Sequence, residues 1–224
     1  MFGCKQHIRN IIVTHWRTFL LINTAIFISA VLTMKNTRNI GEINSKIIVD
    51  EISSIYADFF MNYPFLMIAI FSMTLYHIQD IFIQQSRKLI ITKQVTGIIV
   101  LQLSTIISFS LGIFIYPIEQ LSKFELAYYV GLLLIKFLCF GIVAAFVLVI
   151  KEVIDNTVLA TTTIFAFLIL NFILKINKLP SLLFFTTDGR FISIFTNIFL
   201  ALGIELIFIW LLSLIMIRKD YMYD

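Results

Sequence analysis

Long apolar stretches alternate with short polar ones along the whole chain. A helix needs about 20 predominantly apolar residues to cross a hydrocarbon core about 30 Å thick, whereas transmembrane strands alternate over segments of about ten residues. The apolar stretches have the helical length and carry few charges, which favours helices. We therefore predict six transmembrane helices, approximately at residues 18–34, 59–76, 95–116, 126–150, 157–174 and 192–217.

The composition excludes most other classes of protein. Of the 224 residues, 60% are apolar and 13% are charged, whereas a typical soluble domain is about 45–50% apolar and about 25% charged. In water such a chain would expose more apolar surface than a folded domain tolerates, which excludes a soluble domain and a disordered tail. The polar stretches are too short for a separate domain. We expect an all-α polytopic membrane protein in which residues 1–224 form a single transmembrane domain.

The charges predict an orientation. With the N-terminus in the cytoplasm, the inner side carries nine Lys and Arg residues and the outer side seven. The outer side also carries seven carboxylates, among them Asp58 before the second span, so the whole net charge of +4 falls inside. Basic residues prefer the cytoplasmic side, where they face anionic lipid headgroups. We therefore expect both termini to be cytoplasmic.

The same features indicate where the protein lies and what it contacts. A multi-pass chain with a basic inner rim is expected in the cell membrane, with the lipid bilayer as its surroundings. The richness in Ile, Phe, Lys and Asn is similar to that of proteins from AT-rich bacteria. No basic run interleaved with aromatic residues is present, so no nucleic-acid partner is expected.

Two further segments are expected to lie along the membrane surface. In residues 1–17, isoleucines and Trp16 recur at helical spacing and basic residues occupy other positions, which predicts an amphipathic interfacial helix. The alternative is a frayed basic terminus. Isoleucines also recur near the helical period over residues 43–59, which predicts an amphipathic helix on the outer face, either a gate or a tether.

Two charged residues fall inside predicted spans. Lys136 lies about ten residues into the fourth span and Glu205 about thirteen into the sixth, near mid-bilayer at about 1.5 Å per residue. An unpaired charge there costs at least about 2.5–3.5 kcal/mol. We expect a Lys136–Glu205 ion pair, either a static clasp or part of a transport path. The alternatives are a Lys136 side chain that reaches toward the interface and a protonated Glu205.

The remaining polar residues inside the spans are expected to be hydrogen-bond partners between helices rather than substrate ligands. They are Asn23, Asn62, Gln102, Ser104, Ser108 and Asn171. No metal site is expected, because His7 and His15 stand eight residues apart without ligand partners and His77 is expected to be an interface residue.

The inner loop at residues 77–94 is the most informative segment. It mixes apolar anchors such as Phe82 with the charges of Asp80, Arg87 and Lys88. A short helix of this kind offers apolar and charged contacts to a cytosolic partner. The alternative is an interfacial loop whose basic residues only set the topology.

The order of residues in this loop resembles that of a known family. Asp80, then Ser86 and Arg87, then Lys93 lie between the second and third spans. With six spans and the amphipathic N-terminal segment, this order resembles the permease subunits of type-2 ABC transporters. In those subunits an acidic residue, a connector, a Ser-Arg pair and a Lys commonly occupy this loop. In size the chain is similar to small permeases that export peptides or confer immunity to them.

Two other regions bear on the resemblance. The chain end at 217–220, Ile-Arg-Lys-Asp, is similar to the apolar-basic-basic-acidic end frequent in the family. Residues 175–191 depart from the family, which often has paired re-entrant helices there; this stretch has room for one short element around 182–185.

The resemblance implies that residues 77–94 are a coupling loop that docks into a separate cytosolic ABC ATPase subunit. The residues it assigns to this contact are Asp80, Phe82, Ser86, Arg87, Lys88 and Lys93. ATP and Mg are expected in that partner, because none of the eight glycines here lies in a G-x-x-x-x-G-K-[ST] loop. The chain would be a transport subunit without enzymatic activity of its own, working beside a second permease chain that is identical or homologous.

The cargo implied by this interpretation is hydrophobic or amphipathic, such as a peptide, because the walls are largely Phe, Ile and Leu. The alternatives are a substrate-binding module similar to the S-component of energy-coupling-factor transporters, and a stand-alone immunity or channel protein. An intramembrane enzyme is disfavoured, because neither a Gly-x-Ser-Gly setting nor an H-E-x-x-H motif is present.

Overall fold

The computed structural model describes residues 13–38, 54–72, 87–115, 123–185 and 190–218. All the regular structure in these ranges is helical. The elements are α2 (Trp16–Arg38), α4 (Ile55–Ala57), the π-helix η1 (Asp58–Asn62), α5 (Tyr63–Ser72), α7 (Arg87–Phe114), α8 (Lys123–Val153), α9 (Thr157–Ile176) and α10 (Phe191–Arg218).

The prediction of an all-helical membrane protein is confirmed in two respects: the described elements are helices, and most of them have the length and apolar composition of membrane spans. Five helices among the described residues are long and apolar enough to cross a membrane: α2, α7, α8, α9 and α10. The second predicted span corresponds to a shorter apolar helix, Ile55–Phe71, which runs through α4, η1 and α5 without a break. This helix starts at Ile55, so Asp58 lies inside it rather than in the outer loop, where it was expected.

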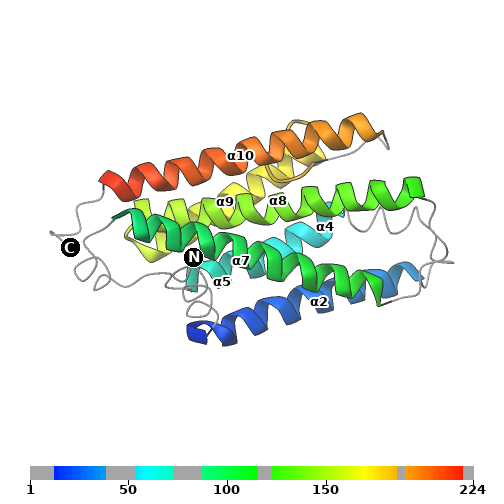
Figure 1. Cartoon of the computed structure of the whole chain (residues 1–224), viewed down its shortest axis with the longest axis horizontal. Helices are drawn as coiled ribbons and strands as arrows, with labels where there is room; N and C mark the ends of the chain where they lie inside the picture. Colours follow the sequence, from blue (N-terminus) through cyan, green and yellow to red (C-terminus); the bar gives the residue numbers. More distant parts are fainter. Residues whose placement is uncertain (1–12, 39–53, 73–86, 116–122, 186–189, 219–224) are drawn as a thin grey trace.

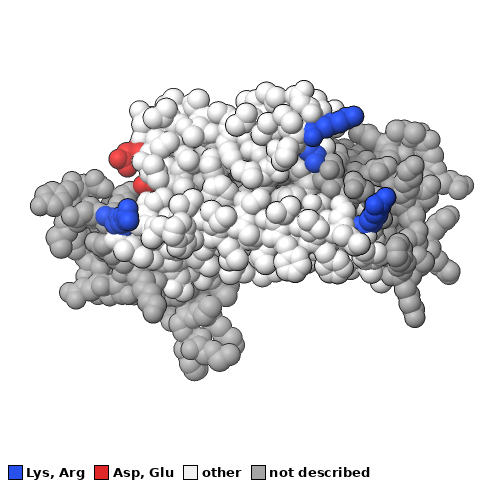
Figure 2. Space-filling view, turned by 90° about the horizontal axis from the view of Figure 1, so that it is seen from above, with Lys and Arg blue, Asp and Glu red and all other residues white. Residues whose placement is uncertain are grey.

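The helices alternate in direction along the chain (Figure 1). The start of α2, the end of α5, the start of α7, the end of α8, the start of α9 and the end of α10 all lie at one end of the bundle, on the left of the view. We call this end the α5–α7 end. Charged side chains gather toward the two ends of the face seen in Figure 2, and the surface between them is uncharged.

α8 is the central helix of the bundle. It packs against α5, α7, α9 and α10. Of an apolar stretch of 18 residues in α8, 78% is buried inside the bundle, whereas the corresponding shares are 22% for α9 and 17% for α10. Ala144, Ala145 and Val147 of α8 are fully buried. The peripheral helices turn large apolar side chains outward, as lipid-facing helices do.

The widened turn of η1 has a local cause. Pro64 lacks an N–H group, and its ring clashes with the carbonyl four residues earlier, which disturbs the α-helical pattern just before it. The N–H of Tyr63 accordingly donates to the carbonyl of Asp58, five residues back. η1 carries Asp58 and Asn62 into the core, where both are buried.

A non-helical segment after α9 folds back into the bundle. The side-chain oxygen of Asn171 accepts hydrogen bonds from the Ser181 hydroxyl (3.0 Å) and the Leu182 N–H (2.8 Å), which hold the segment in a tight turn. Leu183 and Phe184 are buried. The short element expected around residues 182–185 is thus a hydrogen-bonded turn rather than a helix. Such backbone is tolerated in a membrane protein where it is buried in protein.

Two surface predictions fall largely outside the described residues. Of the interfacial helix expected at 1–17 only residues 13–17 are described, and Trp16 is an exposed residue that opens α2. Of the outer helix expected at 43–59, residues 55–59 form the start of the helix Ile55–Phe71, in which Tyr56 is exposed and Asp58 is buried, so this part belongs to the second predicted span rather than to a separate surface helix.

Candidate functional site

The most polar part of the bundle core is an ion pair between α8 and η1. Lys136 of α8 forms this pair with the carboxylate of Asp58, and their side chains are 4% and 8% exposed. Asn62, one turn after Asp58, donates from Nδ2 to Asp58 Oδ1 at 2.8 Å. The Lys136 ammonium also lies 4.8 Å from the ring centroid of Phe109 on α7. Asp58 therefore has two partners in the core, the ammonium of Lys136 and the amide of Asn62.

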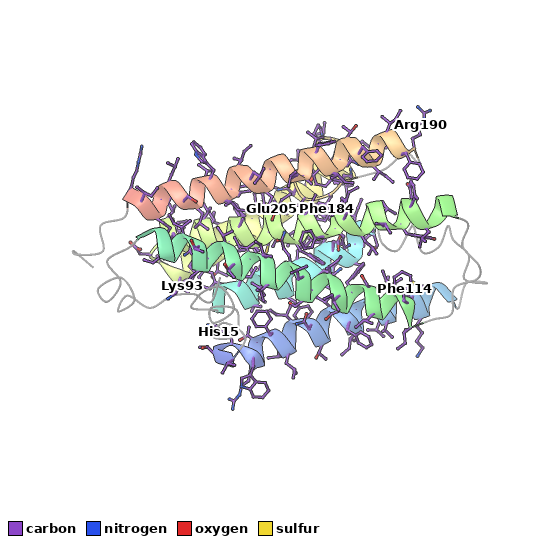
Figure 3. All side chains as sticks on the ribbon, viewed as in Figure 1. His15, Lys93, Phe114, Phe184, Arg190 and Glu205 are labelled. Atoms are coloured by element: carbon purple, nitrogen blue, oxygen red, sulfur yellow. The ribbon has the colours of Figure 1, made fainter. Side chains whose placement is uncertain are left out.

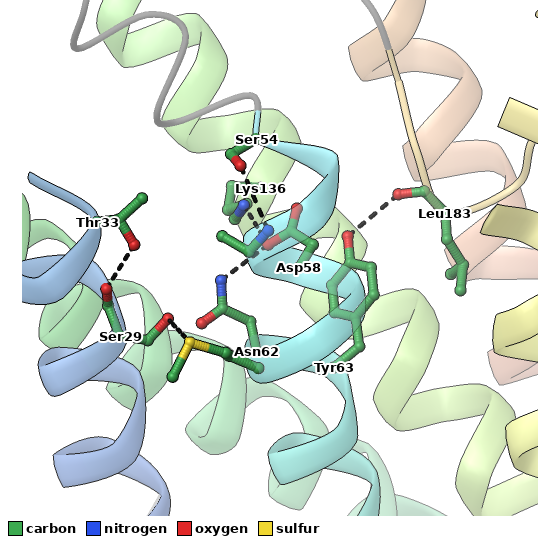
Figure 4. Close-up of polar contacts among 10 residues, drawn as sticks. Ser29, Thr33, Ser54, Asp58, Asn62, Tyr63, Lys136 and Leu183 are labelled. Atoms are coloured by element: carbon green, nitrogen blue, oxygen red, sulfur yellow. Dashed lines mark hydrogen bonds and ion pairs between the residues drawn. The ribbon is translucent and has the colours of Figure 1, made fainter. Parts of the chain in front are cut away.

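A small cavity borders the ion pair, whose polar contacts are drawn in Figure 4. It has a volume of about 30 Å³ and is lined by Asp58, Lys136, Tyr63 and Cys139 together with apolar side chains. The Tyr63 hydroxyl donates to the carbonyl of Leu183 at 3.1 Å, so the turn after α9 closes one wall. A cavity of this size holds a water molecule, whereas drug-sized ligands occupy about 300–1,000 Å³.

Glu205 belongs to a separate polar contact. It lies on α10, midway along the bundle (Figure 3), and is 6% exposed. Gln102 of α7 donates from Nε2 to Glu205 Oε1 at 2.6 Å and also to the carbonyl of Phe137 on α8 at 3.3 Å. A Cβ atom built on Gly141 of α8 would overlap both the Gln102 amide and the Glu205 carboxyl. The lack of a side chain at Gly141 therefore lets this contact form.

The expected Lys136–Glu205 ion pair is wrong. The structure pairs Lys136 with Asp58 and gives Glu205 a hydrogen bond from Gln102 instead. The physical reason is that the helix of the second span begins at Ile55, earlier than the apolar run, and carries Asp58 into the core. The sequence carried a sign that Asp58 belongs to this helix, because Asp58 and Asn62 stand four residues apart and would share one helix face.

The polar residues expected to join helices do so at several positions. Ser108 of α7 donates to Asn23 of α2 at 3.0 Å, and Gln102 links α7 to α10 as described. Asn171 holds the turn after α9, and Asn62 contacts Asp58 within its own helix, so these two act locally rather than between long helices.

A further group of contacts lies at the α5–α7 end. Lys151 in the last turn of α8 donates to the carbonyl of Phe71 in α5 at 2.9 Å, and its ammonium lies 5.7 Å from the ring centroid of Phe71. The next residue, Glu152, accepts from Gln94 of α7 at 3.1 Å. The last turn of α8 therefore contacts both the end of α5 and the first turns of α7.

The structure covers the predicted coupling residues in part. Arg87, Lys88 and Lys93 lie in the first turns of α7, so the helix begins earlier than the predicted start of the third span at 95. Lys93 precedes Gln94 and lies toward the α5–α7 end (Figure 3). The other assigned residues, Asp80, Phe82 and Ser86, lie outside the described residues.

Comparison of the chain with protein-family models, with curated proteins and with solved structures gave no match. Among the described residues, no His, Cys, Asp and Glu side chains gather into a group able to hold a metal ion. The class that the fold itself defines is a helical membrane protein with a polar centre on its middle helix.

Proposed function

We propose that the chain is the membrane-spanning permease subunit of an ATP-driven ABC exporter in a bacterial cell membrane. In this proposal the short helix Ile55–Phe71 is the second of six crossings, so both termini lie on one side of the membrane, which we take to be the cytoplasmic side because the basic residues favour it. The alternation of helix directions supports six crossings, because the start of α2 and the end of α10 share the α5–α7 end.

One observation carries the proposal. Residues 77–86, the larger part of the loop at 77–94 that resembles a coupling loop, lie in the connection between the end of α5 and the start of α7. Both flanks of this stretch are bound by neighbouring residues of α8: Phe71 by Lys151 at 2.9 Å and Gln94 by Glu152 at 3.1 Å. A force applied to the loop would therefore reach the central helix through two hydrogen bonds at a single turn.

This geometry suits a subunit driven from outside the membrane. Closure of the partner ATPase, on binding ATP and Mg, would push on the loop, and α8 would carry the displacement to the helices packed around it. Within the described part of the chain, the cavity beside the ion pair has a volume of about 30 Å³, which is too small for a peptide. The cargo path is therefore expected at the interface with the second permease chain rather than through a single chain. A hydrophobic or amphipathic cargo, such as a peptide, suits its largely apolar outer faces.

The test is purification of the tagged chain from its native host in a mild detergent, with mass spectrometry of bound proteins. We expect an ABC ATPase subunit that is lost on the double change Arg87→Glu and Lys88→Glu. The matched control is Lys178→Glu with Arg190→Glu, which reverses two charges in the α9–α10 connection and should retain the ATPase. A chain that arrives alone, or an ATPase that ignores the change at Arg87 and Lys88, would contradict the proposal.

A further inference from the structure

Glu205 is a buried carboxyl without a cation. It lies midway along the bundle, is 6% exposed, and among the described residues it forms no ion pair. Its hydrogen-bond partner is the neutral amide of Gln102 at 2.6 Å. Ionised carboxylates inside a membrane are otherwise found paired, because an uncompensated charge there is costly.

The neighbouring titratable groups do not neutralise it. α10 packs against α8 and α7. On α8 the nearest charged residue along the helix is Lys136, which is paired with Asp58 and lies against the ring of Phe109. The other titratable group on this part of α8 is the buried thiol of Cys139. On the facing part of α7 the contact residue is the uncharged Gln102.

The packing around the carboxyl is also tight. A Cβ atom on Gly141 would overlap Glu205 Oε1 and Gln102 Nε2, so these groups lie directly against the backbone of α8. A protonated carboxyl keeps the hydrogen bond from Gln102 through its carbonyl oxygen and removes the charge from the membrane. The ionised form would keep one bond to a neutral donor and retain the full desolvation penalty.

We propose that Glu205 is a proton-binding site, occupied by a proton while α10 lies against α7 and α8, and that Asp58 is the ionised carboxyl of the core. The ligand is a single proton taken from water. This inference does not depend on the transport proposal.

The experiment is infrared spectroscopy of the full chain in lipid nanodiscs at pH 7. A protonated carboxyl gives a C=O stretching band apart from that of a carboxylate. We expect this band in the unchanged chain, a shift of the band after labelling glutamate carboxyls with ¹³C, and no shift after labelling aspartate carboxyls. The band should be lost in Glu205→Gln. The matched control is Glu152→Gln, since Glu152 also accepts from a glutamine, Gln94 at 3.1 Å, but follows Lys151 at the end of α8.

Three results would overturn the proposal: no protonated-carboxyl band at pH 7, a band that follows the aspartate label, or a band lost in Glu152→Gln and kept in Glu205→Gln. The labelling uses the unchanged sequence, so it decides between a protonated glutamate and a protonated aspartate even where a variant fails to fold.

Discussion

Two carboxyls lie buried in the same helical bundle, and their surroundings differ. Asp58 faces the ammonium of Lys136 and the amide of Asn62, whereas Glu205 receives one hydrogen bond from Gln102. Asp58 belongs to a charge pair that spans two helices. Glu205 belongs to a neutral contact that depends on the absence of a side chain at Gly141.

The comparison shows that an acidic residue inside a membrane is accommodated in two physically distinct ways. An ion pair keeps both charges and makes each partner depend on the other, because removal of one leaves an uncompensated charge. A protonated carboxyl removes the charge and tolerates a neutral substitute. Changes around Asp58 should therefore have large effects that a second change rescues, and those at Glu205 should be small.

The largest effect is expected from Lys136→Met. It leaves Asp58 buried without its cation and should lower the free energy of unfolding by about 3–5 kcal/mol. The double variant Lys136→Met with Asp58→Asn removes both charges and should recover most of this loss. Unfolding in mixed micelles of increasing denaturing-detergent fraction measures both. A loss below about 1 kcal/mol in the single variant would contradict a buried ion pair.

A smaller loss is expected from Gly141→Ala. The added methyl group overlaps Gln102 and Glu205, and overpacking of this kind typically costs about 1–3 kcal/mol. Gly203→Ala on α10 is the control, because nothing lies within 4 Å of its added Cβ, and it should leave stability unchanged or raise it by up to about 1 kcal/mol, since alanine is the better helix former. Equal effects of the two changes in the same unfolding assay would argue against the close contact at Gly141.

Removal of the Tyr63 hydroxyl should have a more modest effect. Tyr63→Phe deletes the hydrogen bond to the buried carbonyl of Leu183 (3.1 Å) and should cost about 1 kcal/mol. Hydrogen exchange of the backbone at Leu183 and Phe184 should become faster, because this bond holds the turn after α9 against the core. Tyr56→Phe, at an exposed tyrosine, is the control and should leave both quantities unchanged.

The smallest effect is expected from Glu205→Gln. An amide has the shape of a protonated carboxyl and carries no charge, so stability at pH 7 should change by about 0.5 kcal/mol or less. Thermal unfolding in detergent at pH 7 provides the measurement. A loss of about 2 kcal/mol or more would show that an ionised Glu205 stabilises the fold, and the contrast with Asp58 would be lost.

Apolar run length predicted the helical class and the approximate position of each helix, because the bilayer imposes the same length on every crossing. It did not predict where the second helix begins. Asp58 interrupts the apolar pattern, and only its pairing with Lys136 across the bundle makes its burial favourable. That contact lies between residues far apart in the sequence. The four-residue spacing of Asp58 and Asn62 indicates a shared helix face but does not identify the partner on α8.

The partner of Glu205 could not be predicted for the same reason, because local sequence patterns do not report contacts between distant helices. Depth along the helix placed Lys136 and Glu205 at similar levels, and opposite charges at one depth predicted a pair. Helix rotation decides the contact, and rotation depends on close approach at residues such as Gly141. Hydropathy likewise identified α8 and α9 as spans without distinguishing the central helix from the peripheral one, since buried and lipid-facing surfaces are equally apolar.

A double-mutant cycle on Lys136 tests the central contrast most directly. The free energy of unfolding is measured for Lys136→Met combined with Asp58→Asn, and separately for Lys136→Met combined with Glu205→Gln. The structure predicts a coupling energy above about 1 kcal/mol for the first pair and within about 0.5 kcal/mol of zero for the second. A large coupling of Lys136 to Glu205 with little coupling to Asp58 would contradict the arrangement described above.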